Sequence, residues 1–127
     1  MTLTDKKLSD RMKAIRAMRP TVPIVERFWS KVRLEPFSGC WLWVGGRTAD
    51  GYGMLGIGTR EQGTVYAHIF SYTIHKGHVP KGLELDHLCR IRHCANPDHV
   101  EPVTRFQNFL RGNHPYAIRL RKKIGWQ

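Results

Sequence analysis

The chain has 127 residues, the length of a single domain, and its 41% hydrophobic and 10% aromatic content supports a modest globular core and excludes a disordered chain. The formal net charge of +11 favours a polyanionic partner, of which nucleic acid is the commonest large example, but charge alone indicates no activity. No apolar stretch approaches the roughly 20 residues of a membrane span and no signal peptide is apparent, so we expect a cytoplasmic protein without membrane contact.

The N-terminal segment, residues 1–22, is rich in lysine and arginine and is predicted to form a basic arm or short amphipathic helix. Its apolar residues at helical spacing are Leu8, Met12 and Ile15. A second helix is expected to begin after Pro23. Its apolar stripe, which we expect to face the core, consists of Val25, Phe28, Trp29 and Val32.

Runs of β-forming residues separated by turn residues occupy the middle of the chain. The runs are Trp41–Val44, Tyr52–Ile57 and Thr64–Ala67. Asp50 and Gly51 favour a turn after the first run because both tolerate positive φ, and Gly63 follows the second run. The simplest interpretation is a three-stranded antiparallel sheet over residues 41–67.

A helix over residues 68–75, ending at Gly77, separates this sheet from the most informative part of the chain. There the pattern predicts a compact ββα unit within residues 83–112. Its elements are a strand over 83–88, a loop over 89–99, a second strand over 100–103 and a helix over 105–111. Thr104 suits the N-cap of that helix and Gly112 suits its end. The expected fold class is therefore α+β, a small antiparallel sheet followed by a ββα core.

One folded domain is expected over residues 23–112, between the basic arm and a basic tail over residues 113–127. The basic residues of the tail are Arg119, Arg121, Lys122 and Lys123, with no acid among them. We expect the tail either to lie on phosphate as a flexible or helical arm or to act as a solubilising end.

Three cysteines are present, and an odd number in a reducing compartment argues against a disulfide framework. Cys89, Cys94 and His99 are evenly spaced, with four residues between each pair. Thiolates and neutral imidazole are the preferred ligands of zinc, and a closed structural site needs four of them. Cys40 is the remaining cysteine and the expected fourth ligand, while His93 is a rival that we expect to face phosphate or solvent. The alternative is three buried free cysteines and a surface histidine.

Asp86 and His87 are adjacent on the strand over 83–88, and a twist at the strand end would let both side chains approach one site. A carboxylate such as Asp86 and an amide oxygen such as that of Asn108 are hard ligands that suit magnesium. Neutral His87 can take a proton from water near physiological pH. These three residues therefore form a candidate site for phosphodiester cleavage with one divalent ion.

Several short motifs within residues 26–112 carry a family resemblance. They are Arg27–Val32, Gly39–Trp43, Gly51–Gly53, Leu85–Cys89, Cys94–His99, Glu101–Thr104 and Asn108. Together they closely resemble the HNH endonucleases of phages and mobile introns, part of the ββα-metal or His-Me finger superfamily. The branch that they resemble most is the one related to the His-Cys box homing endonucleases.

The resemblance implies a zinc-stapled ββα-metal core in which His87 is the general base and Asn108 binds the catalytic magnesium or manganese ion. Asp86 matches the acidic ligand of ordinary HNH enzymes, which the His-Cys box enzymes lack. The zinc ligands of the latter match Cys40 and the three evenly spaced residues that follow Asp86. The final motif position departs from the family pattern, because Asn108 stands there instead of histidine. Asn96 is the candidate for the central asparagine and is expected to shape the loop.

The hypothesis that follows is a metal-dependent DNA endonuclease, nicking or cutting both strands as a monomer or homodimer, encoded by a phage or mobile element and active in the host cell. The alternative is a non-catalytic zinc module that binds DNA or RNA through charge. Candidate phosphate contacts are Arg47, Arg60, Arg90, Arg92, Arg105 and Arg111. His68 is expected either to pack on Tyr66 or Tyr72 or to act as an accessory residue at a phosphate or the leaving group.

Overall fold

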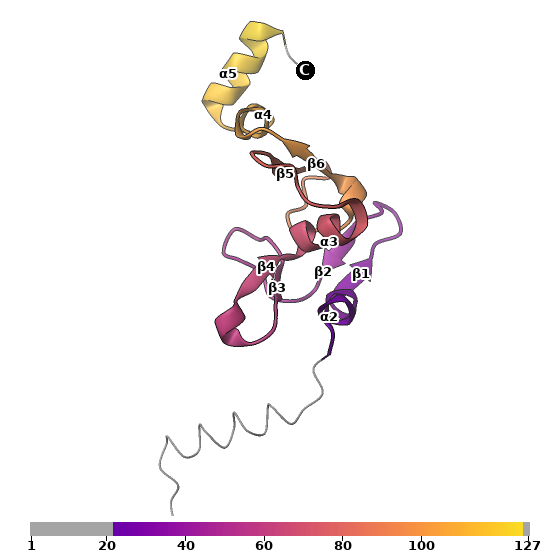
Figure 1. The fold of residues 1–127 in the computed structure, drawn as a ribbon. Coiled ribbons are helices and arrows are strands. Elements are labelled where there is room, and N and C mark those ends of the chain that lie inside the picture. The colour runs from indigo at the N-terminus through magenta and orange to yellow at the C-terminus, as the bar shows by residue number, and fades with distance from the viewer. Residues whose placement is uncertain (1–21, 126–127) are drawn as a thin grey trace, which may run out of the picture.

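The computed structural model of the protein describes residues 22–125 and has the α+β architecture that the sequence predicts (Figure 1). The helix predicted within the N-terminal arm lies outside the described residues. The described helices are α2 (Ile24–Ser30), α3 (Ala67–Lys76), α4 (Arg105–Leu110) and α5 (Pro115–Ile124), with 3-10 turns at Arg60–Gln62 and Pro97–His99. The strands are β1 (Val32–Leu34), β2 (Trp41–Trp43), β3 (Met54–Gly56), β4 (Thr64–Tyr66), β5 (Glu84–His87) and β6 (Val100–Val103). No helix in this range is both long and apolar enough to cross a membrane.

Helix α2 is shorter than its apolar stripe predicts. It ends at Ser30, and the stripe residue Val32 instead begins β1, where it pairs with Trp43 of β2. The expectation that Val32 belongs to the helix was therefore wrong. Val32 is β-branched, and strand pairing satisfies its backbone groups while its side chain still packs against the core.

The middle of the chain does not form the predicted three-stranded sheet. β3 pairs with β4 in an antiparallel manner as expected, but β2 pairs with β1 instead of β3. β1 takes one edge of β2 and the loop around Cys94 takes the other, so β3 has no edge to pair with. After β2 the chain turns around the indole of Trp43. Its Nε1 donates to the carbonyl of Gly46 at 3.1 Å, and a Cβ at Gly45 or Gly53 would lie only 2.8 or 2.7 Å from the indole. These glycines let the backbone pass close to the ring.

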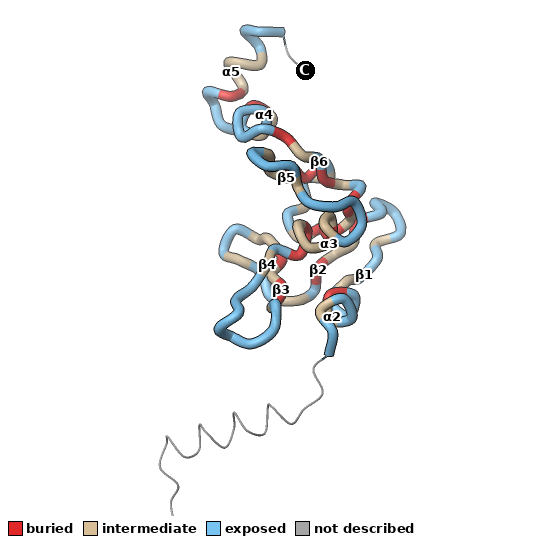
Figure 2. The backbone as a smooth tube through the Cα atoms, in the orientation of Figure 1, coloured by how far each residue is buried: buried red, intermediate tan, exposed pale blue. Residues whose placement is uncertain are grey.

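The main hydrophobic core joins α2, β2, β3 and α3 (Figure 2). Its buried members are Phe28, Trp43, Leu55, Ala67 and Ala95. The rings of Phe28 and Trp43 are stacked, with centroids 5.6 Å apart. Ala95 belongs to the cysteine-containing loop, so the same core holds that loop against the first half of the domain.

The ββα unit is present where the sequence predicts it. β5 pairs antiparallel with β6, so that His87 lies opposite Val100. Thr104 caps α4, because its hydroxyl accepts from the backbone N–H of Gln107 at 3.1 Å. The Gln107 side chain accepts in return from the backbone N–H of Thr104 at 2.9 Å, which completes a capping box. α4 lies against β5, and this contact places the end of α4 beside His87 and its neighbours.

The first part of the predicted C-terminal tail is helical and packed. α5 contacts α4, and its Ala117 is fully buried. Arg121 of α5 donates hydrogen bonds from Nη1 to the carbonyls of Leu110 and Gly112, the latter at 2.8 Å. These carbonyls lie at the C-terminal end of α4 and just after it, where a helix leaves its last carbonyls without partners. Arg121 therefore fastens α5 to the ββα unit.

The close approach of Gly53 to Trp43 leads to a stability prediction. Gly53→Ala should lower the free energy of unfolding by about 1–3 kcal/mol, because the new methyl overpacks the indole. Gly46→Ala is the matched control, since a Cβ at that position meets no atom within 4 Å, and it should change stability by less than about 0.5 kcal/mol. Urea denaturation of both variants measures the difference. Equal effects at the two sites would contradict the role given to Trp43.

Candidate functional site

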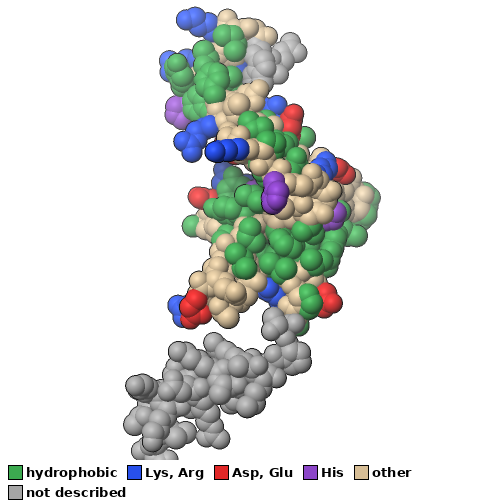
Figure 3. All heavy atoms as spheres, viewed as in Figure 1, with side chains coloured by type: hydrophobic (Ala, Val, Ile, Leu, Met, Phe, Trp, Pro, Cys, Tyr) green, Lys and Arg blue, Asp and Glu red, His purple; other side chains and the backbone are tan. Residues whose placement is uncertain are grey.

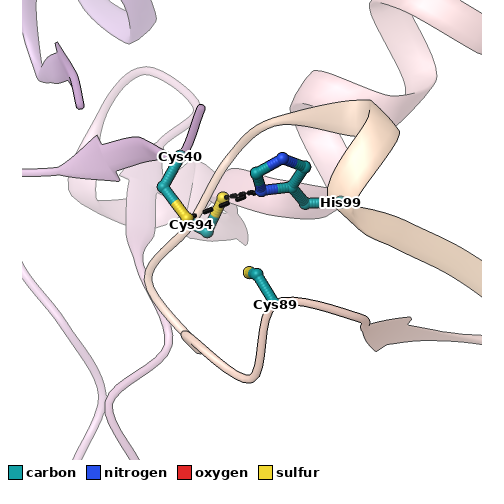
Figure 4. A group of neighbouring side chains, drawn as sticks. All are labelled: Cys40, Cys89, Cys94 and His99. Atoms are coloured by element: carbon teal, nitrogen blue, oxygen red, sulfur yellow. Dashed lines mark hydrogen bonds between the residues drawn. The ribbon is translucent and has the colours of Figure 1, made fainter. Parts of the chain in front are cut away.

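All four residues of the predicted zinc set meet in one cluster (Figure 4). One ligand atom each from Cys40, Cys89, Cys94 and His99 lies within 4.8 Å of every other. The Nδ1 atom of His99 is 3.5 Å from the Sγ atoms of both Cys40 and Cys94. Three thiols and one imidazole are a typical donor set for tetrahedral zinc. Their ligand atoms would have to move together only slightly to form bonds of about 2.0–2.3 Å to one central ion. The cluster can therefore hold a metal ion such as zinc.

Backbone pairing between β2 and the loop brings distant Cys40 to the other three residues. The N–H of Ala95 donates to the carbonyl of Trp41 at 2.7 Å, and the N–H of Trp43 donates to the carbonyl of His93 at 2.9 Å. Because Cys40 directly precedes β2 and Cys94 lies between these two bonds, their thiols come together. This pairing also explains why His93 is outside the cluster: its backbone belongs to the β2 contact, whereas His99 points back toward the thiols.

Asn96 shapes the loop, as the sequence indicates. Its Nδ2 donates to the carbonyl of Gly39 at 2.7 Å, and its Oδ1 accepts from the backbone N–H of Asp98 at 2.9 Å. The first bond joins the loop to the turn before β2, and the second caps the 3-10 turn that carries His99. Gly39 has φ of 74°, a conformation that glycine adopts at low cost, and a Cβ there would lie 3.5 Å from the His99 ring.

Burial opposes ionisation of the thiols in this cluster. It raises the pKa of Cys94 to about 12 and raises that of Cys89 above its usual value, because a thiolate loses hydration there and lies near other thiols. A bound dication reverses this balance, since each thiolate then has a positive partner. Four protein ligands leave no open position for a substrate, so the cluster is suited to a structural role.

His87 lies beside this cluster at the end of β5 and is buried. Its Nε2 is 3.0 Å from the carbonyl oxygen of Cys94. A carbonyl oxygen only accepts, so neutral His87 carries its proton on Nε2 and keeps the lone pair of Nδ1 free. Burial lowers the pKa of His87, while the Cys94 carbonyl and the Asp86 carboxylate act in the opposite direction. The net result is a neutral imidazole near physiological pH, the form that a general base requires.

Asn108 of α4 faces β5, where an unexpected partner holds it. Its Nδ2 donates to Oε1 of Glu84 at 2.7 Å. This bond orients the amide but does not involve its Oδ1, which is an oxygen suited to a hard cation. Glu84 was not among the predicted site residues. The signal was available, because Glu84 and Asp86 are two apart on a strand and therefore share one face.

Both oxygens of Asp86 are engaged by arginines. Oδ1 accepts from Arg90 at 3.2 Å and Oδ2 from Arg111 at 3.1 Å, and Arg111 also contacts Glu101 at 2.9 Å. The carboxylate is buried, and a buried charge needs such partners. Each carboxylate oxygen has two lone-pair positions, so a metal contact from Asp86 is compatible with both arginine bonds. Arg90 holds its position with φ of 62°, which is uncommon for a residue other than glycine.

An open hollow with a volume of ≈ 630 Å³ unites these groups. It is lined by the predicted residues Asp86, His87 and Asn108, by Glu84 and Tyr52, and by Arg90, Arg92, Arg105 and Arg111. The other two candidate arginines do not line it: Arg47 is paired by its backbone with Gly53, and Arg60 lies on the 3-10 turn before β4. The guanidinium of Arg92 lies 5.5 Å from the ring centre of Tyr52, a cation–π contact. Tyr52 was not predicted as part of the site, although it belongs to the Gly51–Gly53 motif of the family resemblance.

His68 opens α3 and lies behind His87. The two imidazole centroids are 4.7 Å apart, and the Tyr52 and Tyr66 rings lie 5.5 and 5.6 Å from His68. The expected packing on Tyr66 is therefore present. The Nδ1 atom of His68 is buried without a hydrogen-bond partner among the described residues. Burial, with a smaller contribution from His87, lowers the pKa of His68 to about 3, so the ring is neutral.

Two comparisons with known proteins agree with this geometry. A family model described as HNH endonuclease matches residues 65–109. The "Uncharacterized gene 5.3 protein" of Enterobacteria phage T3 is 31% identical over 70 residues, which cover 53% of this chain and 69% of that relative. The chain belongs to the HNH endonuclease family. No solved structure matches it significantly.

The matched segment of this HNH protein contains most of the site. It runs from β4 through α3 and the ββα unit to α4, and so includes His87, Asn108 and three of the four cluster residues. Cys40 and Arg111 lie outside it and join the site through the tertiary structure. Membership in the HNH family supports a nuclease-type or DNA-binding role, with nucleic acid as substrate or partner.

The cluster geometry predicts which histidine is needed for metal binding. Wild-type protein should contain about one zinc per chain by elemental analysis, and a chelator should lower its melting temperature. His99→Ala should lose the zinc and much of the stability, whereas the matched control His93→Ala should keep both, because His93 lies outside the cluster. A His99→Ala chain that is zinc-free yet as stable as the wild type would contradict a structural metal.

The buried His68 predicts a dependence of stability on pH. In the unfolded chain a histidine titrates near 6.5, whereas folded His68 titrates at about 3. Between these values the unfolded chain binds a proton that the folded chain does not, so the free energy of unfolding falls as the pH drops below 6.5. Above pH 6.5 this destabilisation is absent, because His68 is neutral in both states. His68→Phe should weaken this dependence relative to wild type, and the exposed control His78→Ala should not. Urea denaturation across this pH range measures the effect.

Proposed function

We propose that the protein is a metal-dependent DNA endonuclease that hydrolyses phosphodiester bonds, with His87 as the general base. The observation that carries this proposal is the orientation of His87. Its Nε2 proton is committed to the Cys94 carbonyl, which leaves Nδ1 as the free nitrogen, and His87 borders a hollow together with Asn108 and four arginines. A protein that only bound nucleic acid through charge would have no use for a buried neutral histidine in this place.

In the proposed reaction a water molecule near Nδ1 of His87 transfers a proton to that nitrogen as its oxygen attacks the phosphorus. A new P–O bond forms, the bond from phosphorus to the leaving sugar oxygen breaks, and the leaving oxygen takes a proton from solvent. The Cys94 carbonyl keeps its hydrogen bond to Nε2 throughout, and it becomes stronger when His87 gains positive charge. The nearby Asp86 carboxylate also stabilises the protonated ring.

Asn108 and Asp86 are proposed to hold a catalytic magnesium or manganese ion. The donor set fits, because an amide oxygen and a carboxylate oxygen are hard ligands, and Glu84 orients the amide for this role. When bound, such an ion would stabilise the additional negative charge of the phosphate during attack. The Cys40 cluster is proposed to hold zinc with a structural role. The structural and the catalytic metal ions would therefore occupy different sites with different ligands.

The arginines that line the hollow are proposed to bind phosphates of the DNA substrate. Arg92 and Arg105 are exposed, and Arg90 has 58% of its side chain exposed even while it contacts Asp86. Arg111 is more buried and is shared between Asp86 and Glu101, so its main contribution is to hold Asp86. Arg47 and Arg60 are proposed as further phosphate contacts outside the hollow.

His68 is proposed as an accessory residue of the same site. With a pKa of about 3 it cannot supply a proton as a cation, but a neutral imidazole still offers one N–H donor. It also borders a second hollow together with Tyr52, Glu84 and Asn108. We propose that it positions the His87 ring and donates to a phosphate or to the leaving group. The relation to a phage protein is consistent with action of a phage-encoded enzyme in a host cell.

The test uses supercoiled plasmid incubated with magnesium or manganese. Wild-type protein should convert the plasmid to nicked or linear forms, EDTA should stop the reaction, and His87→Ala should slow it by roughly a hundred- to ten-thousandfold. His78→Ala is the matched control, because His78 is exposed and lies outside both hollows, and it should retain full activity.

Two outcomes would contradict the proposal. Equal cleavage by wild type and His87→Ala would show that another group is the base. DNA binding without cleavage in either divalent ion would show that the protein is a zinc-containing module that binds DNA or RNA.

A further inference from the structure

The outer face of α5 carries three cations whose role the cleavage site does not explain. Arg119, Lys122 and Lys123 are all exposed. They are three and four residues apart on one helix, so they project from the same side of it. None of them forms an ion pair with a residue between 22 and 125.

No negative charge offsets these cations along the chain. After Glu101 the sequence contains no aspartate or glutamate, yet it has six lysines and arginines, two of which line the hollow. Figure 3 shows lysine and arginine side chains at the end of the molecule formed by α4 and α5. A rigid surface with one sign of charge raises the local concentration of polyanions.

The helix is fixed in place and begins at the rim of the hollow. The buried Ala117 and the bonds from Arg121 hold it against α4, so α5 is not a loose tail. Gly112 and Asn113, which connect α4 to α5, themselves line the hollow. A polyanion that extends out of the hollow past these residues would therefore meet α5.

We propose that the outer face of α5 binds the phosphates of duplex DNA that flank the segment held in the hollow. A ten-residue helix is about 15 Å long, which is comparable with four base pairs of duplex. This surface supplies affinity and holds the duplex in register, without contact to the reacting phosphate. The choice of DNA as the ligand rests on the proposed function. The binding itself does not require that the protein cleave the DNA.

A duplex fits this surface better than an anionic membrane does. A helix that binds at a membrane interface needs its apolar face free to enter the lipid. In α5 that face is turned inward, since Ala117 is fully buried and Ile118 and Leu120 are half-buried. Tyr116 and Ile124 are exposed near the two ends of the helix, and the exposed side chains between them are the three cations, which suit the backbone of a nucleic acid.

The experiment measures binding of a fluorescent DNA duplex in EDTA, so that no cleavage occurs, over a series of salt concentrations. The α5 variant Arg119→Gln, Lys122→Gln, Lys123→Gln should weaken binding on the order of tenfold or more at low salt and reduce the slope of log affinity against log salt by about 2–3. The matched control is Lys31→Gln, Arg33→Gln, Lys81→Gln, which removes the same charge from exposed positions outside both hollows. It should leave the slope near that of wild type.

A charge-retaining variant excludes a merely structural effect. Arg119→Lys, Lys122→Arg, Lys123→Arg should bind as tightly as wild type. If the α5 variant has the wild-type slope, or if the control triple loses as much, the inference is wrong. It is also wrong if the α5 variant loses binding to anionic phospholipid vesicles but not to the duplex. Failure of wild type to cleave plasmid would sink the nuclease proposal alone, because the binding measured in EDTA does not depend on cleavage.

Discussion

The backbone pairing of β2 with the loop around Cys94 is the contact on which the rest of the site depends. Two main-chain hydrogen bonds, at Trp41 and Trp43, hold the loop along the strand. They bring Cys40 to Cys94 across more than fifty residues of sequence and place Ala95 in the main core. A domain of this size has a small core, so a metal-stapled loop adds constraint where hydrophobic burial alone is limited.

A hydrogen bond joins the Cys40 cluster to the proposed cleavage site. The carbonyl of Cys94 accepts the proton of His87 Nε2, while the thiol of the same residue belongs to the metal cluster. The residue that anchors the loop therefore also sets the tautomer of the proposed base. A structural metal in the cluster would therefore support the proposed reaction without taking part in it, since a loop that moved would release His87 along with the thiols.

The proposed cleavage site has further supports on the other face of β5. Glu84 orients Asn108, and Arg90 with Arg111 holds the Asp86 carboxylate. Asp86 and His87 are adjacent on one strand, so their side chains leave it in opposite directions and need separate supports. His68, Tyr52 and the Cys94 carbonyl surround His87, whereas α4 and the arginines surround Asp86. Both nonetheless border the same hollow because they lie at the end of the strand.

The amino-acid sequence by itself determined the ββα unit, the cap of α4 and the four members of the metal cluster. Each of these depends on local spacing or on ligand chemistry: thiols and imidazoles at even intervals, a strand that alternates, a threonine before a helix. The sequence also placed Asp86, His87 and Asn108 in one site, with family resemblance supplying their roles. It failed where a long-range contact decided the outcome, as with Val32 and the predicted three-stranded sheet, because β1 and the loop around Cys94 occupy both edges of β2.

Only the tertiary structure decided how the site residues are held. The pairing of Glu84 with Asn108, the engagement of Asp86 by Arg111, and the burial of His68 beside His87 all join elements that lie far apart in sequence. It also decided that residues 115–124 form a helix packed on α4, since that packing depends on Arg121 reaching the carbonyls of Leu110 and Gly112. Spacing identifies which residues can do chemistry. Their orientation, protonation and partners follow from contacts that exist only once the chain has folded.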